Sequence, residues 1–411
     1  RESFTAVYVI FTYEQKRKKE NGNADQLWIQ DEPVAFEKVD DYTVKFILPS
    51  PSAAALHNIV TETFIIPEHV FKDVEDFSVN ELPVAAVGTG PYKLEEYKRG
   101  EYLTFEANEF YFGGEAGIQN VTLRIITSSD TAKVALQKGE VDAAVVLPSD
   151  IDDLDTDTIT VYPYSENRVG YMGLNTPSEA LKDEKVRQAV LFALNKEELN
   201  QAAYLDAKYY EQPYSFLPPN NPYVSEDVEK YETNIEKSKE LLQEAGVTDL
   251  KLNLAFSATD PAQTVQATLI QQQLQKAGIN VTLEGGDGTA IFTELKKEGS
   301  TKYNLFLGGY IMGNDPDLYG ALFRTNGSAN YFQTNNPVTD KLFDAAALEL
   351  DADKRQALYD ELQAEVAKDA RFYPIVDNKR ILAVNNRISD VEAATLIPIY
   401  AFEDMSKLSI K

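Results

Sequence analysis

The strongest constraint on the fold is a run of alternating strand and helix patterns between residues 250 and 307. Apolar and polar residues alternate over 250–256, which predicts a strand with one buried face. Asp260 followed by proline predicts a helix start, and strand patterns return at 279–283 and 303–307. Because helical stretches separate the three strands, we expect crossover connections and a parallel sheet.

The stretch after the third strand is a candidate wall of a ligand site. Its sequence, LGGYIMGNDPDLYGALF, runs from Leu307 to Phe323. Parallel α/β sheets bind ligands at the carboxyl ends of their strands, and this stretch lies directly after that end of strand 303–307. The expected architecture alone therefore makes this stretch a candidate wall of the ligand site.

The acidic part of this stretch has three interpretations: a metal loop, a catalytic carboxylate pair, or a turn that lines a ligand site. Asn314, Asp315 and Asp317 surround Pro316. The proline interrupts the spacing of a calcium loop and no closing glutamate follows, so a metal is not favoured. A carboxylate pair stays open as an interpretation. It has no specific support, because a chain with 66 acidic residues contains close pairs by chance. We favour a turn in which Asp315 and Asp317 cap a helix beginning near Leu318, and for Asp317 we prefer this role to ligand contact.

An earlier segment predicts another strand–helix–strand unit. Residues 121–126 and 141–147 have strand patterns, and a short helix ending at Gly139 separates them. The second strand is almost entirely apolar, which is typical of a strand buried on both faces.

Composition excludes several classes of protein. The net charge of -27 argues against nucleic acid and anionic membrane surfaces as partners. The absence of cysteine excludes disulfides, thiolate nucleophiles and zinc fingers. Because His57 and His69 are the only histidines, a catalytic triad or a histidine-rich metal site has little support, and we expect no cofactor. No apolar run approaches the roughly 18 residues of a membrane span.

Aromatic residues favour a ligand site near residue 310. The chain has 23 tyrosines and 20 phenylalanines, and Tyr310, Tyr319 and Tyr331 lie in or near the stretch described above. Tyrosine packs its ring while its hydroxyl stays available, which suits ligand clefts, although any single tyrosine is as well explained by ordinary packing.

Separated segments of the chain also resemble one family in their order. They are FTAVYVIFTYE (4–14), PVAAVGTGPYKLEEYKRGEYLTFEANEFYFGG (83–114), ALQKGEVDAAVV (135–146), GYMGLNTPSEALKDEKVRQAVLFALNKEEL (170–199), YNLFLGGYIMGNDPDLYGALF (303–323) and YPIVDNKR (373–380). Each motif alone is loose, but the ordered series covers nearly the whole chain. It resembles the peptide/nickel class of extracellular solute-binding proteins, family 5, which serve ABC importers.

The resemblance implies an α/β, two-lobed periplasmic-binding-protein-like fold of type II. Mixed and parallel sheets form each lobe, and a hinge and ligand cleft lie between the lobes. Residues 1–80 would be part of an inserted subdomain of lobe I, 81–168 lobe I, 169–374 lobe II, and 375–411 the return to lobe I. In the family a long stretch precedes the FTA segment, so the N-terminal portion of lobe I, the lipoprotein signal and the lipid-bearing cysteine are expected upstream of Arg1.

The function implied is that of a substrate-binding component that encloses oligopeptides and delivers them to the ABC permease subunits, without catalysis. A monomer is expected, lipid-anchored on the extracellular face of a bacterial membrane or held in the periplasm. Several members of the family have an aspartate that pairs with the peptide's amino terminus where this chain has Met312. Ligand grip would therefore come from main-chain hydrogen bonds and permissive side-chain pockets.

The strand-end argument and the resemblance together nominate eight cleft residues. They are Tyr171, Asn175, Ser257, Tyr310, Met312, Asn314, Tyr331 and Phe332. Two alternatives stay open. An oligosaccharide would fit the same fold, whereas the two histidines disfavour a nickel chelate. An acidic secreted hydrolase would need a cleft carboxyl group with a strongly raised pKa.

Overall fold

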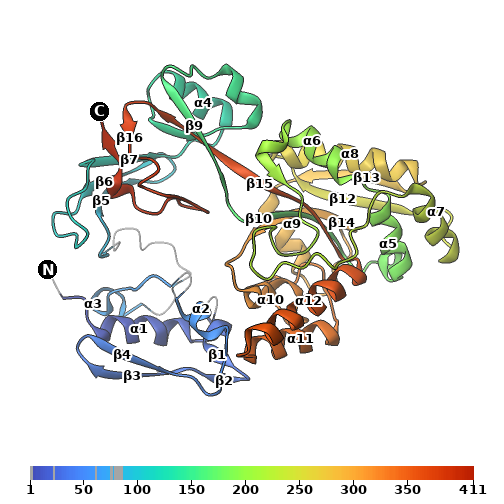
Figure 1. Ribbon diagram of the computed structural model, residues 1–411, viewed down its shortest axis with the longest axis horizontal. Coiled ribbons are helices and arrows are strands. Elements are labelled where there is room, and N and C mark those ends of the chain that lie inside the picture. The colour runs from blue at the N-terminus through green and yellow to red at the C-terminus, as the bar shows by residue number, and fades with distance from the viewer. Residues whose placement is uncertain (1–2, 22–23, 61–62, 75–76, 78–86) are drawn as a thin grey trace. The chain divides into compact units, whose positions relative to one another are not determined.

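Residues 3–21, 24–60, 63–74, 77 and 87–411 are described by a computed structural model (Figure 1). The chain divides into a first unit, residues 1–162 with 382–411, and a second unit, residues 163–381. It passes from one unit to the other within β9 (Ile159–Ser165) and again within β15 (Phe372–Asn385). The boundary expected near residue 80 lies outside the described residues.

The second unit is built on a mixed sheet with the strand order β11-β15-β10-β14-β12-β13. Its further strands are β10 (Arg168–Leu174), β11 (Tyr210–Glu211), β12 (Lys251–Ser257), β13 (Asn280–Gly286) and β14 (Leu305–Ile311). β12 pairs in parallel with both β13 and β14, whereas β10 runs antiparallel to β14 and β15. The predicted parallel crossover run is thereby confirmed.

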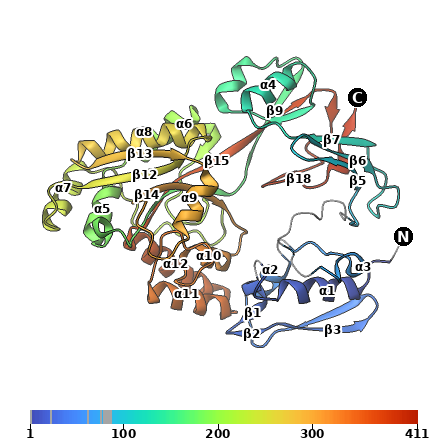
Figure 2. The same cartoon turned by 180° about the vertical axis from the view of Figure 1, so that it is seen from behind.

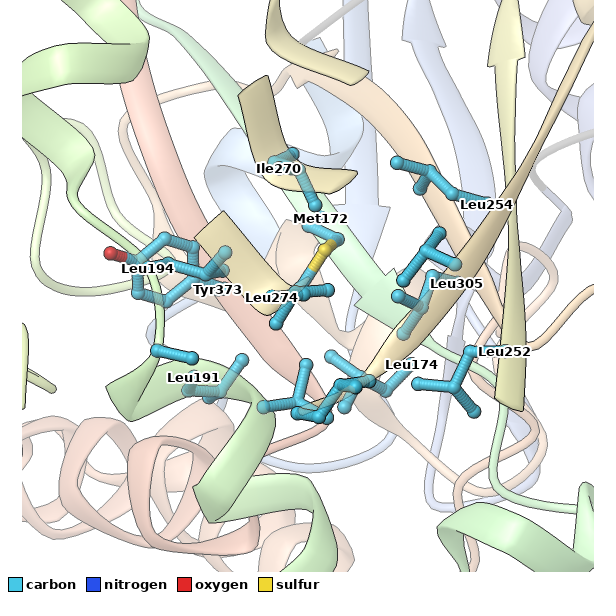
Figure 3. Close-up of a cluster of buried hydrophobic side chains, with 14 of the residues drawn as sticks. Met172, Leu174, Leu191, Leu194, Leu252, Leu254, Ile270, Leu274, Leu305 and Tyr373 are labelled. Atoms are coloured by element: carbon cyan, nitrogen blue, oxygen red, sulfur yellow. The ribbon is translucent and has the colours of Figure 1, made fainter. Parts of the chain in front are cut away.

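Aliphatic side chains cover one side of this sheet, which we call the aliphatic face. It is packed by α5 (Glu184–Phe192), α6 (Lys196–Tyr204), α7 (Ile235–Glu244) and α8 (Pro261–Lys276). Figure 3 shows Leu252, Leu254, Ile270, Leu274 and Leu305 meeting in this core. The Asp260 carboxylate accepts from the Gln263 amide and caps α8, as its sequence predicts.

Aromatic side chains cover the opposite side, which we call the aromatic face. It is packed by α9 (Gly288–Leu295), α10 (Gly320–Phe323), α11 (Pro337–Leu348) and α12 (Ala352–Asp369). Figures 1 and 2 show α8 and α12 on opposite sides of the sheet. Alternation along β14 separates the two faces, since Leu305 and Leu307 join the aliphatic core and Phe306 joins the aromatic one.

β14 is longer than its sequence predicts, because it extends through Gly308 and Gly309 to Ile311 instead of ending at residue 307. A Cβ at Gly308 would lie 2.8 Å from the hydroxyl oxygen of Tyr171 on β10. A Cβ at Gly309 would lie 2.2 Å from Nη2 of Arg168 on the same strand. The glycines therefore do not end the strand but make room for the side chains of its neighbour.

The first unit contains short strands and helices. Its N-terminal elements are α1 (Ala6–Lys16), β1 (Trp28–Ile29), β2 (Glu32–Pro33), β3 (Ala35–Asp40), β4 (Thr43–Ile47), α2 (Ala55–Val60) and α3 (Glu68–Phe71). Its later elements are β5 (Tyr92–Lys98), β6 (Tyr102–Ala107), β7 (Asn120–Arg124), α4 (Ser129–Gln137), β8 (Ala143–Val145), β16 (Ile388–Ser389), β17 (Leu396–Ile397), β18 (Ala401–Phe402) and β19 (Ser409–Ile410). Contacts among α1, β3 and β4 hold the N-terminal part together.

The two strands and the helix predicted over residues 121–147 are present, but the prediction that they form one parallel unit is wrong. β7 belongs to the antiparallel sheet β5-β6-β7, whereas β8 pairs antiparallel with β15. The alternating burial of β8 also contradicts a strand buried on both faces, because Ala143 and Val145 are exposed. The apolar sequence alone did not reveal that the partner of β8 comes from the far end of the chain.

Candidate functional site

The carboxyl ends of β12 and β14 and the start of β10 form one polar edge of the second unit. Ala255 of β12 lies opposite Phe306 of β14, and Arg168 of β10 lies opposite Ile311. This register places Ser257, Met312 and Arg168 at the same edge, which we call the strand-end edge. It is the position where α/β sheets bind their ligands.

Asp315 has a structural role in the acidic loop. Its carboxylate accepts from the Asp317 amide at 3.0 Å, and so it caps the 3₁₀ turn Pro316–Tyr319. Both of its oxygens also accept from Nη2 of Arg355, at 2.8 and 2.9 Å, in a buried ion pair. The predicted capping role is therefore confirmed for Asp315. It is wrong for Asp317, because that residue lies inside the turn and pairs with Arg324 at 3.5 Å.

The buried arginine is fully engaged with the protein. Arg355 donates through Nε to the Ala346 carbonyl and through its other nitrogens to the hydroxyls of Tyr223 and Tyr359. The Asp315–Arg355 pair therefore fixes the loop to α12. Within the part of the chain that the structure describes, no group of three His, Cys, Asp or Glu residues is arranged to hold a metal ion.

Three of the eight nominated residues are buried on the aromatic face. Tyr171, Tyr310 and Phe332 are 2%, 8% and 1% exposed. The Tyr171 ring lies 5.5 Å from that of Tyr310 and 5.6 Å from that of Phe332. The Tyr310 hydroxyl donates to the Phe216 carbonyl at 2.5 Å. These side chains form the support beneath the strand-end edge.

Asn175 is also buried and acts within the protein. Its side-chain amide donates to the carbonyls of Ser300 and Tyr303 at 2.8 and 2.9 Å, and its backbone N–H donates to the Asn304 carbonyl. Asn175 thus ties the end of β10 to the segment that leads into β14. It lies at the opposite end of β10 from Arg168.

The other four nominated residues retain solvent access. Ser257 and Met312 are partly exposed and Asn314 is exposed at the strand-end edge. The Ser257 hydroxyl contacts the Thr259 hydroxyl at 3.1 Å. Tyr331 is partly exposed beside α9, where its ring packs edge-on against Phe292 at 4.7 Å. These residues offer hydroxyl, thioether and amide groups but no charge.

The charged residues of the strand-end edge escaped the sequence prediction. Arg168 begins β10, and its Nη1 donates to the Asn378 side-chain oxygen at 2.9 Å. Beside them Asp377 is only 5% exposed, and its Oδ1 has no hydrogen-bond partner. Burial, reinforced by Glu211, raises the pKa of the Asp377 carboxyl to about 7, against a hydrogen bond from the Arg168 backbone. An acidic residue directly after the buried run Phe372–Val376 was the signal available in the sequence.

Because ligands of α/β sheets bind at the carboxyl ends of strands, the strand-end edge is the candidate ligand site of the second unit. A sequence model of the bacterial extracellular solute-binding proteins, family 5 (middle region), matches residues 2–386. The chain therefore belongs to this family, whose members are binding proteins of transport systems.

Individual relatives agree with this membership. The crystal structure of the ABC transporter substrate-binding protein CtaP from Listeria monocytogenes has a TM-score of 0.92 and 35% identity, covering 100% of this chain and 84% of that one. The oligopeptide-binding protein AppA of Bacillus subtilis is 28% identical over 90% of this chain and 71% of its own length. The structure of AppA in complex with a nonapeptide has a TM-score of 0.87 and 23% identity, covering 100% of this chain and 84% of AppA, and supports the fold.

Proposed function

We propose that this protein is the extracellular binding component of an ABC importer and that it carries oligopeptides to the permease subunits. The observation that carries the proposal is the similarity to the oligopeptide-binding protein AppA over 90% of the chain. The strand-end edge is compatible with a peptide, because its partly exposed side chains are mostly uncharged and suit a ligand of variable sequence.

The proposed mechanism is closure of two lobes around an extended peptide. The chain passes between its two units twice, which is the connectivity that a hinge requires. Residues 1–80, 81–168 and 375–411 would contribute to lobe I and residues 169–374 to lobe II. Hydrogen bonds to the peptide main chain supply affinity in such a site, and water-filled pockets accept different side chains.

The eight nominated residues would have two roles. Ser257, Met312, Asn314 and Tyr331 have solvent access and would contact the ligand or its hydration shell. Of the buried residues, Tyr171, Tyr310 and Phe332 would support the strand-end edge, and Asn175 would hold the opposite end of β10. Met312 offers no charge for a peptide amine, so grip on the amino terminus would come from neutral groups.

Native mass spectrometry of the purified protein tests the ligand class. Variable co-purified masses that fragment as peptides are the expected result. A single glycan mass would instead support the oligosaccharide alternative, for which the aromatic residues around Tyr331 are the relevant feature. A spectrum that stays empty after refolding and addition of peptides would contradict the proposed ligand.

We further propose that the protein binds without chemistry. Asp377 meets one requirement of the hydrolase alternative, a carboxyl group whose pKa is raised to about 7. However, Asp377 is only 5% exposed, and its Oδ1 atom is buried away from solvent. Incubation with peptides and glycans, followed by mass analysis, should give no cleavage products. Turnover that disappears in Asp377→Asn would overturn this part of the proposal.

The remaining parts of the proposal concern the cellular setting. The protein would act as a monomer outside the cytoplasmic membrane, lipid-anchored at the bacterial surface or free in the periplasm. Among the helices that the structure describes, none has the length and apolar sequence needed to cross a membrane. Analytical ultracentrifugation tests the oligomeric state, and cell fractionation tests the location.

A further inference from the structure

Arg168 differs from every other arginine of the second unit, residues 163–381, all of which the structure describes. The other five each form an ion pair, and they are Arg187, Arg324, Arg355, Arg371 and Arg380. Arg168 forms none, although the whole chain has 66 acidic residues against 39 basic ones. In a chain with so many acidic residues, an arginine whose only role was to stabilise the fold would be expected to form an ion pair.

Two glycines make room for the guanidinium of Arg168. A Cβ at Gly309 would lie 2.2 Å from Nη2, and a Cβ at Gly170 would lie 3.1 Å from Nη1. The planar group therefore occupies space that any other residue at position 309 would fill. Asn378 accepts from Nη1 at 2.9 Å and sets the remaining orientation. Such preorganisation lowers the entropy cost of engaging a ligand.

Most of the hydrogen-bonding capacity of this guanidinium is unused by the protein. A guanidinium carries five N–H donors, and here one hydrogen bond to a side chain engages it. Arg168 is partly exposed, so the remaining donors are accessible from solvent. A fork of N–H donors matches the two oxygens of a carboxylate.

The Arg168 charge acts on the buried Asp377, and the exposed Glu211 lies opposite Asp377 on β11. Burial, reinforced by Glu211, raises the pKa of the Asp377 carboxyl to about 7. Near neutral pH this neighbour therefore neutralises the arginine incompletely. Met312, at the end of the adjacent strand, adds no negative charge. The strand-end edge thus offers a fixed cation and no exposed fixed anion among its nominated residues.

We propose that Arg168 is a specificity-determining residue that binds a carboxylate of the peptide ligand. The proposal rests on the proposed function and extends it, because it gives the ligand a charge requirement. The carboxylate would belong to the peptide's C-terminus or to an acidic side chain, and both sources present the same pair of oxygens. Peptides lacking any carboxylate would bind through main-chain contacts alone.

Three synthetic probes test this proposal by isothermal titration calorimetry. They are hexaalanine with a free C-terminal acid, hexaalanine amide, and a hexapeptide amide with one glutamate among alanines. We expect the wild-type protein to bind the free acid roughly 10- to 100-fold more tightly than the amide, as a charge-assisted hydrogen-bond pair provides. Tight binding of the glutamate-containing amide would assign the site to side-chain carboxylates, and its failure to exceed hexaalanine amide would assign it to the terminus.

Two variants localise the effect. Arg168→Gln should reduce the ratio between acid and amide affinities to about one. Gly309→Ala should lower the same ratio without removing charge, because the new methyl group displaces the guanidinium. Arg371→Gln is the matched control, since it removes the same charge beside the other end of β10, where the Arg371 carbonyl accepts from the Leu174 amide. It should keep the wild-type ratio.

The outcomes separate the two proposals. Equal affinity of the wild-type protein for acid and amide would overturn the role of Arg168 and leave peptide binding intact. Retention of the acid preference in Arg168→Gln would also overturn it. If the wild-type protein binds none of these peptides, nor alanine peptides from two to nine residues long, both the proposed function and the role of Arg168 fail.

Discussion

The two faces of the sheet in the second unit use different chemistry. On the aliphatic face, leucine, isoleucine and valine pack under regular helices such as α8, together with buried polar side chains such as Asn200, Ser238 and Gln273. On the aromatic face, tyrosine and phenylalanine rings pack under short helices and loops, with the Asp315–Arg355 pair buried among them. The aliphatic face depends on apolar burial. The aromatic face depends in addition on the buried Asp315–Arg355 ion pair, and it is the face that carries the loop of the strand-end edge.

Asp315→Ala should produce the largest loss of stability, because it breaks the polar network of the aromatic face. It leaves Arg355 buried without its counter-charge, which costs about 3–5 kcal/mol. Urea unfolding should show a lower midpoint. Asp344→Ala is the control, because its ion pair with Arg324 involves a carboxylate that is 67% exposed. That change should cost less than about 1 kcal/mol, and equal losses in the two variants would contradict the structural role of Asp315.

Leu274→Ala tests the aliphatic face, where cavity formation should be the only cost. Leu274 is fully buried at 0% exposure, so the change should lower the free energy of unfolding by about 2–5 kcal/mol. The acid-to-amide affinity ratio should stay unchanged, because Asn378 and the space beside Gly170 and Gly309 position the Arg168 guanidinium. A loss of that ratio would show that the core beneath α8 also positions this guanidinium.

Asp377 predicts a pH dependence for the aromatic face. The pKa of its carboxyl is about 7 in the folded protein against 3.8 ordinarily, so the folded state binds the proton more tightly. Its stabilising contribution is present below pH 4 and is lost as the pH rises to about 7. The slope is about 1.4 kcal/mol per pH unit. Asp377→Asn should remove this slope when unfolding free energies are compared between pH 4.5 and 6.5.

Lys196 on α6 predicts a pH dependence of the opposite sign and serves as a control for Asp377. Burial, with a smaller effect of Lys230, lowers the pKa of Lys196 to about 7. The unfolded chain then holds more protons between about pH 7 and 10.5, so stability should increase as the pH rises through that window. Lys196→Met should flatten this increase and leave the acidic slope intact. A change in the acidic slope would mean that Asp377 does not titrate independently.

A pair of tyrosines gives the smallest and sharpest test. The Tyr310 hydroxyl donates to the Phe216 carbonyl, so Tyr310→Phe should cost about 1 kcal/mol. The Tyr319 hydroxyl is buried without a hydrogen-bond partner, and Tyr319→Phe should be neutral or stabilising. Thermal unfolding of both variants measures the difference, and a larger loss for Tyr319→Phe would reverse this assignment.

The sequence predicted the periodic parts of the molecule. The helix starting at Asp260 and the parallel strands β12, β13 and β14 follow local patterns that tertiary contacts reinforce. β8 was misplaced because its partner, β15, is far away in the chain. The end of β14 was misplaced because Gly309 is explained only by the Arg168 side chain beside it.

The candidate site was less predictable than the fold. The family resemblance and the strand-end argument nominated residues at one edge of the sheet, but they did not separate Ser257, which has solvent access, from Tyr171, which is buried. Arg168 carried no local signal, because its unpaired state depends on where every acidic residue lies. Ion pairing is a property of the whole tertiary structure, and no short motif encodes it.

The double passage of the chain between its units has a consequence for synthesis. The second unit is one continuous segment, residues 163–381, so every contact within it becomes available once that segment has left the ribosome. The first unit needs residues 382–411, which follow the second unit in the chain, and β8 in particular waits for Leu382–Val384 as its pairing partner. The order of synthesis therefore favours the second unit as the first to fold. The first unit is completed only when residues 382–411 have been synthesised.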